Sequence, residues 1–444
     1  MKAESEGPHV RLGDHVDLLT GFPFQSSEFT DDPKDIRLLR GDNVSQGELR
    51  WDGAKRWPAG RADKLEKFVL REGDVILAMD RPWIEAGLKF ASVTEQDVPS
   101  LLVQRVARLR AKPSLEQGFL RYLVASKEFT DYVVGIQTGT AVPHISGAQI
   151  QSFRFSLPPL PVQASIAHVL GSLDTKTQLN RRMNQTLEQI SQILFKSWFI
   201  DFDPVRAKAE GRWKKGESLR GMPADMWGLW PSEFEESEVG KTPRSWTLTT
   251  VGGVTQTSGG STPFTGNPSY WEGGNIPWAT PSDLGKLKSP VLLDTEKHLT
   301  PAGLEECISG LLPKHTVLLS SSASIGYLAV AAVPTATNQG FISLRPSPKA
   351  SPFFLFEWVS NNMSSILELA HGTTFQRINL GEFANLPICL PPLELMARYH
   401  ALVQPLFERM VAGERECIGL SQVRDVLLPK LLSGEIRLHM DGTK

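Results

Sequence analysis

Residues 139–145 read GTAVPHI and lead into LPPL at residues 157–160. Residues 372–378 read GTTFQRI and lead into LPPL at residues 390–393. Both pairs of motifs are 233 residues apart (372 − 139 and 390 − 157). Solenoid units repeat roughly every 20–50 residues, so a repeat of this length indicates a duplicated domain. Two similar domains suit a protein that engages two similar targets at a fixed separation.

Composition narrows the class of protein. The chain has 444 residues, 41% of them hydrophobic, which is enough for two or more domains with their own cores. Its formal net charge of −2 gives no global basic field, so DNA binding would need local positive charge or a partner subunit. The three cysteines form no CxxC pair, the amino terminus lacks an apolar signal core, and no apolar run could span a bilayer. We therefore expect a soluble cytoplasmic protein that uses no membrane.

The apolar pattern predicts a mixed α/β unit in each half of the chain. In the first half it predicts strands at 36–39, 75–78, 89–93 and 103–109 and a helix at 115–134. In the second half the same order recurs, with strands at 276–279, 317–319 and 339–345 and a helix at 353–370. The predicted fold class is α+β, with two similar α/β domains that are each followed by a long helix.

Five segments follow from the prolines and from the change in composition between them. They are a first domain at 1–157, a first helix at 158–200, a connector at 201–245, a second domain at 246–389 and a second helix at 390–444. The connector has neither helical nor strand periodicity. It contains several tryptophans, which free linkers normally lack, so we expect it to be ordered.

The two long helices are predicted to pack on each other. No proline interrupts 162–199, and apolar residues recur there at spacings of three and four up to Trp198. One heptad row of the first helix holds Ile166, Leu173, Asn180, Leu187 and Leu194, and the other holds Val169, Lys176, Met183 and Ile190. In the second helix the rows hold Tyr399, Leu406, Gly413, Leu420 and Leu427, and Leu402, Arg409, Glu416 and Val423. Both helices are polar in the middle, so an antiparallel coiled coil would place Lys176 near Glu416.

Motifs for catalysis are missing from the sequence. It has no GxxxxGK[ST] phosphate loop, no HExxH, no GxSxG and no paired Cys/His spacing for zinc. The stretch NPSY at 267–270 is similar to the NPPY motif of amino-methyltransferases, but the second proline is missing and no glycine-rich turn precedes it. We therefore expect no catalytic residue and no metal site in this chain.

Three segments carry a resemblance to a known family. They are QASIAHVLGSLDTK at 163–176, LFKSWFIDFDPV at 194–205 and LPKLLSGEI at 428–436. The chain resembles the specificity subunit of type I restriction-modification enzymes over its whole length. The segment at 194–205 is highly specific, whereas the two domains match only in their framework.

The resemblance implies a function without catalysis. Each domain would be a target-recognition domain that reads one half of a bipartite site in double-stranded DNA. The coiled coil would set the spacing and dock two copies of a DNA adenine methyltransferase subunit, and a restriction-translocase subunit would join them. S-adenosylmethionine, ATP and Mg²⁺ would then belong to the partner subunits, and this chain would hold no cofactor. The residues expected to form the coil and the docking surface are Ile166, Leu173, Lys176, Leu187, Leu194, Trp198, Leu406, Glu416, Leu420 and Leu427.

DNA contacts are expected from polar loops at the ends of the predicted strands, because loops present side chains at a surface. The candidates in the first domain are Arg40, Asp42, Asn43, Arg81, Trp83, Thr138, Gly139, Thr140 and His144. The candidates in the second domain are Ser261, Thr280, Asp283, Ser322, Thr373, Thr374, Gln376 and Arg377. The two Gly-Thr loops are the strongest candidates, since glycine lets the backbone approach a ligand closely. For any single residue the alternative is that it only shapes a turn.

Two other functions remain open at this point. The near-neutral charge also suits a non-catalytic scaffold or adaptor that binds a protein or a carbohydrate. An enzyme fused to its own recognition domains is disfavoured by the missing motifs. The sequence gives neither the target bases nor the spacer length.

Overall fold

The computed structural model describes residues 8–139, 142–219, 221–372 and 376–438. The chain divides into two compact units. Unit 1 comprises Met1–Lys176 and Leu420–Lys444, and unit 2 comprises Thr177–Gly419. Each long helix therefore contributes one part to each unit.

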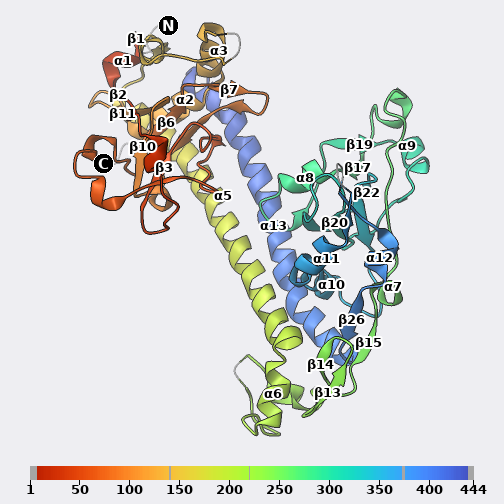
Figure 1. Cartoon of the computed structure of the whole chain (residues 1–444). Coiled ribbons are helices and arrows are strands. Elements are labelled where there is room, and N and C mark those ends of the chain that lie inside the picture. The colour runs from red at the N-terminus through yellow and green to blue at the C-terminus, as the bar shows by residue number, and fades with distance from the viewer. Residues whose placement is uncertain (1–7, 140–141, 220, 373–375, 439–444) are drawn as a thin grey trace. The chain divides into compact units, whose positions relative to one another are not determined.

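Unit 1 is built on a five-stranded sheet with the order β2-β11-β6-β9-β4 (Figure 1). Its strands are β2 (Val16–Thr20), β11 (Val106–Ala111), β6 (Val75–Ala78), β9 (Phe90–Ser92) and β4 (Gln46–Gly47). Within this sheet β4 and β9 pair in parallel, and the other neighbouring strands pair antiparallel. A smaller sheet has the order β10-β3-β5, with β10 (Ser100–Leu102), β3 (Ile36–Leu39) and β5 (Arg56–Trp57). The buried strand β6 is apolar throughout, as its sequence predicts.

Unit 2 repeats this topology. Its larger sheet has the order β16-β23-β20-β21-β18, and its smaller sheet has the order β19-β17-β22. The strands are β16 (Thr257–Ser258), β23 (Phe341–Leu344), β20 (Val317–Ser320), β21 (Leu328–Ala331), β18 (Val291–Leu292), β19 (Lys297–Leu299), β17 (Ile276–Ala279) and β22 (Ala336–Thr337). As in unit 1, the end strand β18 pairs in parallel and the other neighbours in the larger sheet pair antiparallel. The duplication predicted from the sequence is thus present in the strand pairing.

The single helix predicted in each unit is two helices. Unit 1 has α2 (Gln117–Ala125) and α3 (Lys127–Ile136), and unit 2 has α10 (Pro352–Asn361) and α11 (Met363–Glu368). Ser126 breaks the first pair because its backbone is extended and its side chain accepts a hydrogen bond from the backbone N–H of Phe129. The apolar spacing continues across the break, which is why the sequence predicts one helix.

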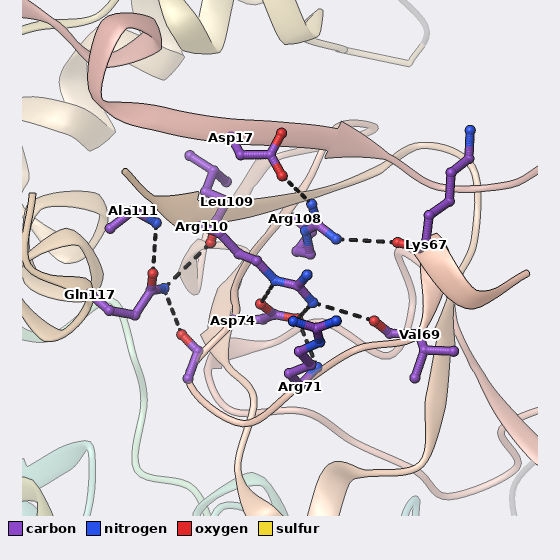
Figure 2. A network of polar contacts seen from close by, with 11 residues as sticks. Asp17, Lys67, Val69, Arg71, Asp74, Arg108, Leu109, Arg110, Ala111 and Gln117 are labelled. Atoms are coloured by element: carbon purple, nitrogen blue, oxygen red, sulfur yellow. Dashed lines mark hydrogen bonds and ion pairs between the residues drawn. The ribbon is translucent and has the colours of Figure 1, made fainter. Parts of the chain in front are cut away.

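A polar network fastens β11 of unit 1 to the loop before β6 (Figure 2). The buried Arg108 donates to the carboxylate of Asp17 and to the carbonyl of Lys67, and Arg110 makes a two-pronged contact with Asp74. Hydrogen bonding to Asp74 raises the pKa of Arg110. Asp74 also accepts from the backbone N–H of Arg71. The contacts of Arg108, Arg110 and Asp74 are made within the fold, so the network is structural.

The long helices are α5 (Leu160–Phe195), with 36 residues, and α13 (Leu393–Leu432), with 40 residues. In unit 1, Asp174 of α5 pairs with Arg424 of α13 at 3.1 Å. In unit 2, Asn180 donates to Glu416 and Asn184 donates to Glu414, each at 2.8 Å. Partner numbers fall along α13 as they rise along α5, so the helices pack antiparallel.

One of the two predicted heptad rows is wrong on both helices. The buried row of α5 lies one residue later than predicted and holds Leu170, Thr177, Asn184 and Ser191, and Trp198 continues it in the helical turn after α5. The buried row of α13 holds Val403, Met410 and Cys417, and Leu431 extends it in unit 1. Ile190, Leu402 and Val423, which the prediction placed in the seam, are exposed by 45–48%. The prediction followed apolar residues, whereas part of the seam is polar.

The other row is placed as predicted. Ile166 is buried, and Leu173, Leu187, Leu194, Leu406, Leu420 and Leu427 are half-buried. Lys176 and Glu416 belong to the row that was misassigned, and their pairing stays a prediction. Asn180, in the correctly predicted row, is the residue that donates to Glu416.

Over its described residues, 201–219 and 221–245, the connector contains regular structure, which its sequence did not predict. It holds α6 (Asp203–Ala209) and the hairpin of β13 (Phe234–Ser237) with β14 (Gly240–Pro243). Trp213 and Trp230 of the connector are buried in the core of unit 2, together with Trp246 just after it, which explains the tryptophan content. The boundaries of the five predicted segments stay predictions.

Candidate nucleic-acid interface

In unit 1 the backbone brings two of the predicted loops together. Asp80, two residues after the end of β6, forms an isolated antiparallel bridge with His144, and the backbone N–H of Arg81 donates to the carbonyl of Pro143 at 2.6 Å. Thr138 and His144 exchange two backbone hydrogen bonds. The Gly-Thr loop and the loop after β6 therefore form one surface. Thr140 lies outside the described residues.

Lys89 joins the third predicted loop to this surface. Its ammonium donates to the carbonyl of Gly41, between Arg40 and Asp42. The pKa of Lys89 is lowered, mainly by burial. The negative charges of Asp42 and Asp80 act to raise this pKa, and the positive charge of Arg81 acts to lower it. The electrostatic surroundings of this one lysine thus include side chains of both the 40–43 loop and the 80–83 loop.

We name the surface formed by the 40–43 loop, the 80–83 loop and the loop from Thr138 to His144 cluster 1. With Lys89 and Arg105 it carries more cations than the sequence analysis predicted. Arg40 lies 3.6 Å from Asp42, and Arg105 lies 3.8 Å from Asp80. Lys89 and Arg105 were missed because they stand directly before β9 and β11. Antiparallel pairing could have found them, since it brings the starts of these two strands to the end of β6.

A short hairpin extends beside cluster 1. It pairs β7 (Trp83–Ile84) with β8 (Gly87–Leu88). Trp83 and Ile84 are each 40% exposed, although both are large apolar residues. Trp83 is therefore accessible, as its place among the candidates requires.

In unit 2 the equivalent loops meet in the same way, and we name their surface cluster 2. Ser322 forms an antiparallel bridge with Arg377, and the backbone N–H of Ile378 donates to the carbonyl of Ser321 at 2.9 Å. Gln376 and Arg377 are exposed. Thr373 and Thr374 lie outside the described residues.

A polar hollow adjoins cluster 2, since Ser322 belongs to both. Its lining includes Thr280, Lys286, Ser322, Tyr327, Asn338 and Gln339. Lys286 is paired with Glu296 at 2.6 Å. The lining is rich in hydroxyl and amide groups, which can both donate and accept hydrogen bonds.

Some of the predicted contact residues shape the loops. Asn43 is 7% exposed, accepts from the backbone N–H of Arg40 and donates to the carbonyl of Arg50. Asp283 is 8% exposed and accepts from the backbone and the hydroxyl of Thr280. The two residues hold equivalent turns after β3 and β17. Their polar atoms are used within the fold.

Ser261 and Gly139 are likewise held by their surroundings. The hydroxyl of Ser261 accepts from the backbone N–H of Ile308 and donates to the carbonyl of Glu306. Gly139 has φ +94°, and a Cβ there would lie 2.7 Å from the carbonyl oxygen of Val142. Only glycine fits this turn without strain.

Among the described residues, no group of three or more His, Cys, Asp or Glu side chains is placed to hold a metal ion. Over the same residues, none of the helices combines the length and the apolar character needed to cross a bilayer.

Comparison with known proteins agrees with this architecture. The family model described as "Type I restriction modification DNA specificity domain" matches residues 8–189 and 243–396. The type I restriction enzyme HindI specificity subunit of Haemophilus influenzae is 28% identical over 413 residues, which cover 83% of this chain and 88% of that protein. The MjaIX specificity subunit of Methanocaldococcus jannaschii is 25% identical over 332 residues, or 74% of this chain and 71% of that one.

A solved structure shares the fold over the full length. The type I restriction-modification S subunit from M. genitalium superposes with a TM-score of 0.54 at 13% sequence identity, and the alignment covers 99% of this chain and 98% of that one. The family model alone spans well over half of the sequence, in both units. The chain therefore belongs to the type I restriction-modification DNA specificity family, as a specificity subunit.

Proposed function

We propose that unit 1 and unit 2 each read one half of a bipartite site in double-stranded DNA, through cluster 1 and cluster 2. The observation that carries this proposal is the duplication of the loop cluster, with the same backbone bridges but different exposed side chains. Asp80 and His144 stand in one copy where Ser322 and Arg377 stand in the other. A common frame with different side chains is what two readers of different sequences need.

The long helices are proposed to set the distance between the half-sites. At about 1.5 Å per residue, α5 is about 54 Å long and α13 about 60 Å. A helix pair of this length makes a stiff spacer. Its buried polar residues, such as Asn180 and Asn184, favour one register, because their side-chain NH2 groups meet Glu416 and Glu414 in that register.

The same helices are proposed to dock two copies of a DNA adenine methyltransferase subunit, which a restriction-translocase subunit would join. Large apolar side chains on the outer faces of the helices support this proposal. Ile193 is 68% exposed, Val426 59% and Leu179 58%. Single exposed apolar residues are common, but several on one pair of helices are typical of a partner surface. Methylation, cleavage and the use of S-adenosylmethionine, ATP and Mg²⁺ would then lie on the partners, and the three free cysteines suit a reducing cytoplasm.

The double variant Gln376→Ala, Arg377→Ala is expected to relax base preference in one half of the site only. These exposed side chains belong to cluster 2, and each bidentate contact to a base is worth about 1–3 kcal/mol of discrimination. The measurement is genome-wide mapping of methylated sites in cells that express the chain with its own methyltransferase subunit. Arg244→Ala, which removes an exposed arginine of unit 2 outside cluster 2, should leave the motif unchanged. Equal loss in both halves, or a continuous motif in the wild type, would refute the proposal.

A further inference from the structure

Two arginines of cluster 1 have an unusual backbone conformation. Arg81 has φ 44° and Arg105 has φ 66°. They are the non-glycine residues with positive φ among the described residues of unit 1. The left-handed region disfavours residues with a Cβ and is open to glycine. A residue kept there against its preference is a reason to ask what its side chain does.

The frame uses the backbone groups at these positions and does not need an arginine side chain there. The backbone N–H of Arg81 donates to Pro143, and the carbonyl of Arg105 accepts from the backbone N–H of Met79. In unit 2 the equivalent carbonyl is that of Gly340, which accepts from Ser321, and the residue after Ser322 is Ala323, with φ 63°. The duplicated fold therefore forms with alanine and glycine where unit 1 has two arginines.

Both guanidinium groups remain available to a ligand. Arg81 is exposed, and the side chain of Arg105 is 62% exposed. Lys89, by contrast, is half-buried and donates into the protein. Of these three cations, Arg81 and Arg105 are the two that are exposed.

DNA offers an arginine two kinds of acceptor, phosphate groups and base edges, and the carboxylate of Asp80 favours the base edges. This carboxylate lies 3.8 Å from Nε of Arg105 and is 39% exposed. A carboxylate at this place repels a phosphate but can accept a hydrogen bond from the N4 amino group of cytosine. An arginine beside it can donate two hydrogen bonds to O6 and N7 of guanine. The pair matches the two bases of a G·C pair in the major groove.

We propose that Arg81 and Arg105 read guanine in the half-site of unit 1, with Asp80 positioning Arg105. This inference rests on the proposed function and adds the base identity that unit 1 requires. The half-site contains at least one G·C pair that depends on Arg105. Cluster 2 has no counterpart of this arginine pair at the equivalent positions.

The test is Arg105→Gly in the complex of the chain with its own methyltransferase subunit. We expect the mapped methylation motif to become degenerate at a guanine of one half, with about 5- to 150-fold loss of discrimination, which corresponds to about 1–3 kcal/mol at about 1.4 kcal/mol per factor of ten. The melting temperature should stay equal or rise, because glycine suits φ 66°. Arg105→Lys keeps the charge but loses the two-pronged geometry, so it should not restore discrimination.

Two variants control for charge and for backbone. Arg61→Ala removes an arginine that is also 62% exposed and also paired with a carboxylate, Glu28. Ser245→Gly relieves another left-handed residue, in the connector. Neither should change the motif. Asp80→Asn should raise affinity for DNA of any sequence and lower discrimination at the same guanine, which a purely structural role would not do.

The outcomes separate this inference from the proposed function. An unchanged motif in Arg105→Gly, or degeneracy at an A·T pair, overturns the guanine assignment while the Gln376, Arg377 variant still relaxes the other half. A wild-type motif with no guanine in the half assigned to unit 1 overturns it as well. A loss of both halves in Arg105→Gly with a lowered melting temperature makes Arg105 a residue of the frame and overturns it too.

Discussion

Trp198→Ala is expected to lower the free energy of unfolding of unit 2 by about 3–5 kcal/mol, the range typical of large aromatic residues removed from a core. Trp198 is 1% exposed and stands in a five-residue π-helical turn, Lys196–Ile200, that follows α5. Its ring packs at 5.3 Å from Trp230 and 5.9 Å from Tyr399, measured between ring centroids. Alanine would leave a cavity that the connector, the end of α5 and the start of α13 all border.

The position of the cavity predicts which segments of the chain lose stability. Hydrogen exchange should accelerate in α6, in β13 and in the first turns of α13, and it should stay unchanged in β6 and β11 of unit 1. Ile200→Ala is the matched control, since Ile200 is two residues away and 42% exposed. A surface change of this kind should fall within about 0.5 kcal/mol. If Trp198→Ala lowered stability no more than Ile200→Ala does, the aromatic cluster would not be what orders the connector.

The aromatic cluster also marks how far the sequence could predict this fold. Buried strands such as β6 and β20 were found because they are continuous apolar runs. The connector was predicted to be ordered from its tryptophans, yet α6 and the β13–β14 hairpin were missed. These elements are short, and side chains far along the chain complete their cores, so local periodicity is weak.

The helix pair shows a different limit. The ends of the two helices are apolar, and one of the two heptad rows that form the seam was predicted correctly. In the middle of α5, Thr177, Asn184 and Ser191 occupy the second buried row. A search for apolar residues moved that row by one position, because a polar residue in a seam looks like an exposed one. Its partner reveals it, as when Asn184 meets Glu414, and partners are not visible in a single sequence.

The loops were predicted from the sequence, but the way they meet in two clusters was not. Strand ends marked the loops that carry Arg81, His144, Ser322 and Arg377, and the structure joins these loops in pairs. The sequence could not separate residues that face outward from residues such as Asn43 and Asp283, whose side chains cap a turn. Both kinds are polar and both follow a strand, and only burial tells them apart.

Glu357→Gln is expected to stabilise unit 2 by about 3 kcal/mol at pH 8 and by less than about 1 kcal/mol at pH 5. Glu357 lies in α10 and is 1% exposed. Its Oε1 accepts from the hydroxyl of Ser191 at 2.7 Å, and its Oε2 has no hydrogen-bond partner among the described residues. Burial raises the pKa of Glu357 from 4.5 to about 7, and the charge of Glu188 adds to this rise.

The sign follows from proton uptake. Below pH 4.5 the side chain of Glu357 is protonated in both the folded and the unfolded chain, so its ionisation does not affect the free energy of unfolding. Between pH 4.5 and about 7 the unfolded chain releases the proton while the folded chain keeps it, so stability falls as the pH rises. Above pH 7 the loss is complete. Glutamine removes the ionisation, and its carbonyl oxygen can still accept the hydrogen bond from Ser191.

Unfolding of the variant and of the wild type should therefore be compared by chemical denaturation across pH 5 to 8. The groups nearest to Glu357 set the conditions: Glu188 also has a pKa raised by burial, and the pKa of Tyr399 is raised by burial and by the charge of Glu357. Glu368→Gln, in α11, is the control, since Glu368 is exposed and its replacement should change stability little at any pH. A stability difference between Glu357→Gln and wild type that stays constant from pH 5 to 8 would mean that Glu357 has the same pKa in the folded and the unfolded chain. Burial in unit 2 would then not disfavour the charged form of this carboxylate.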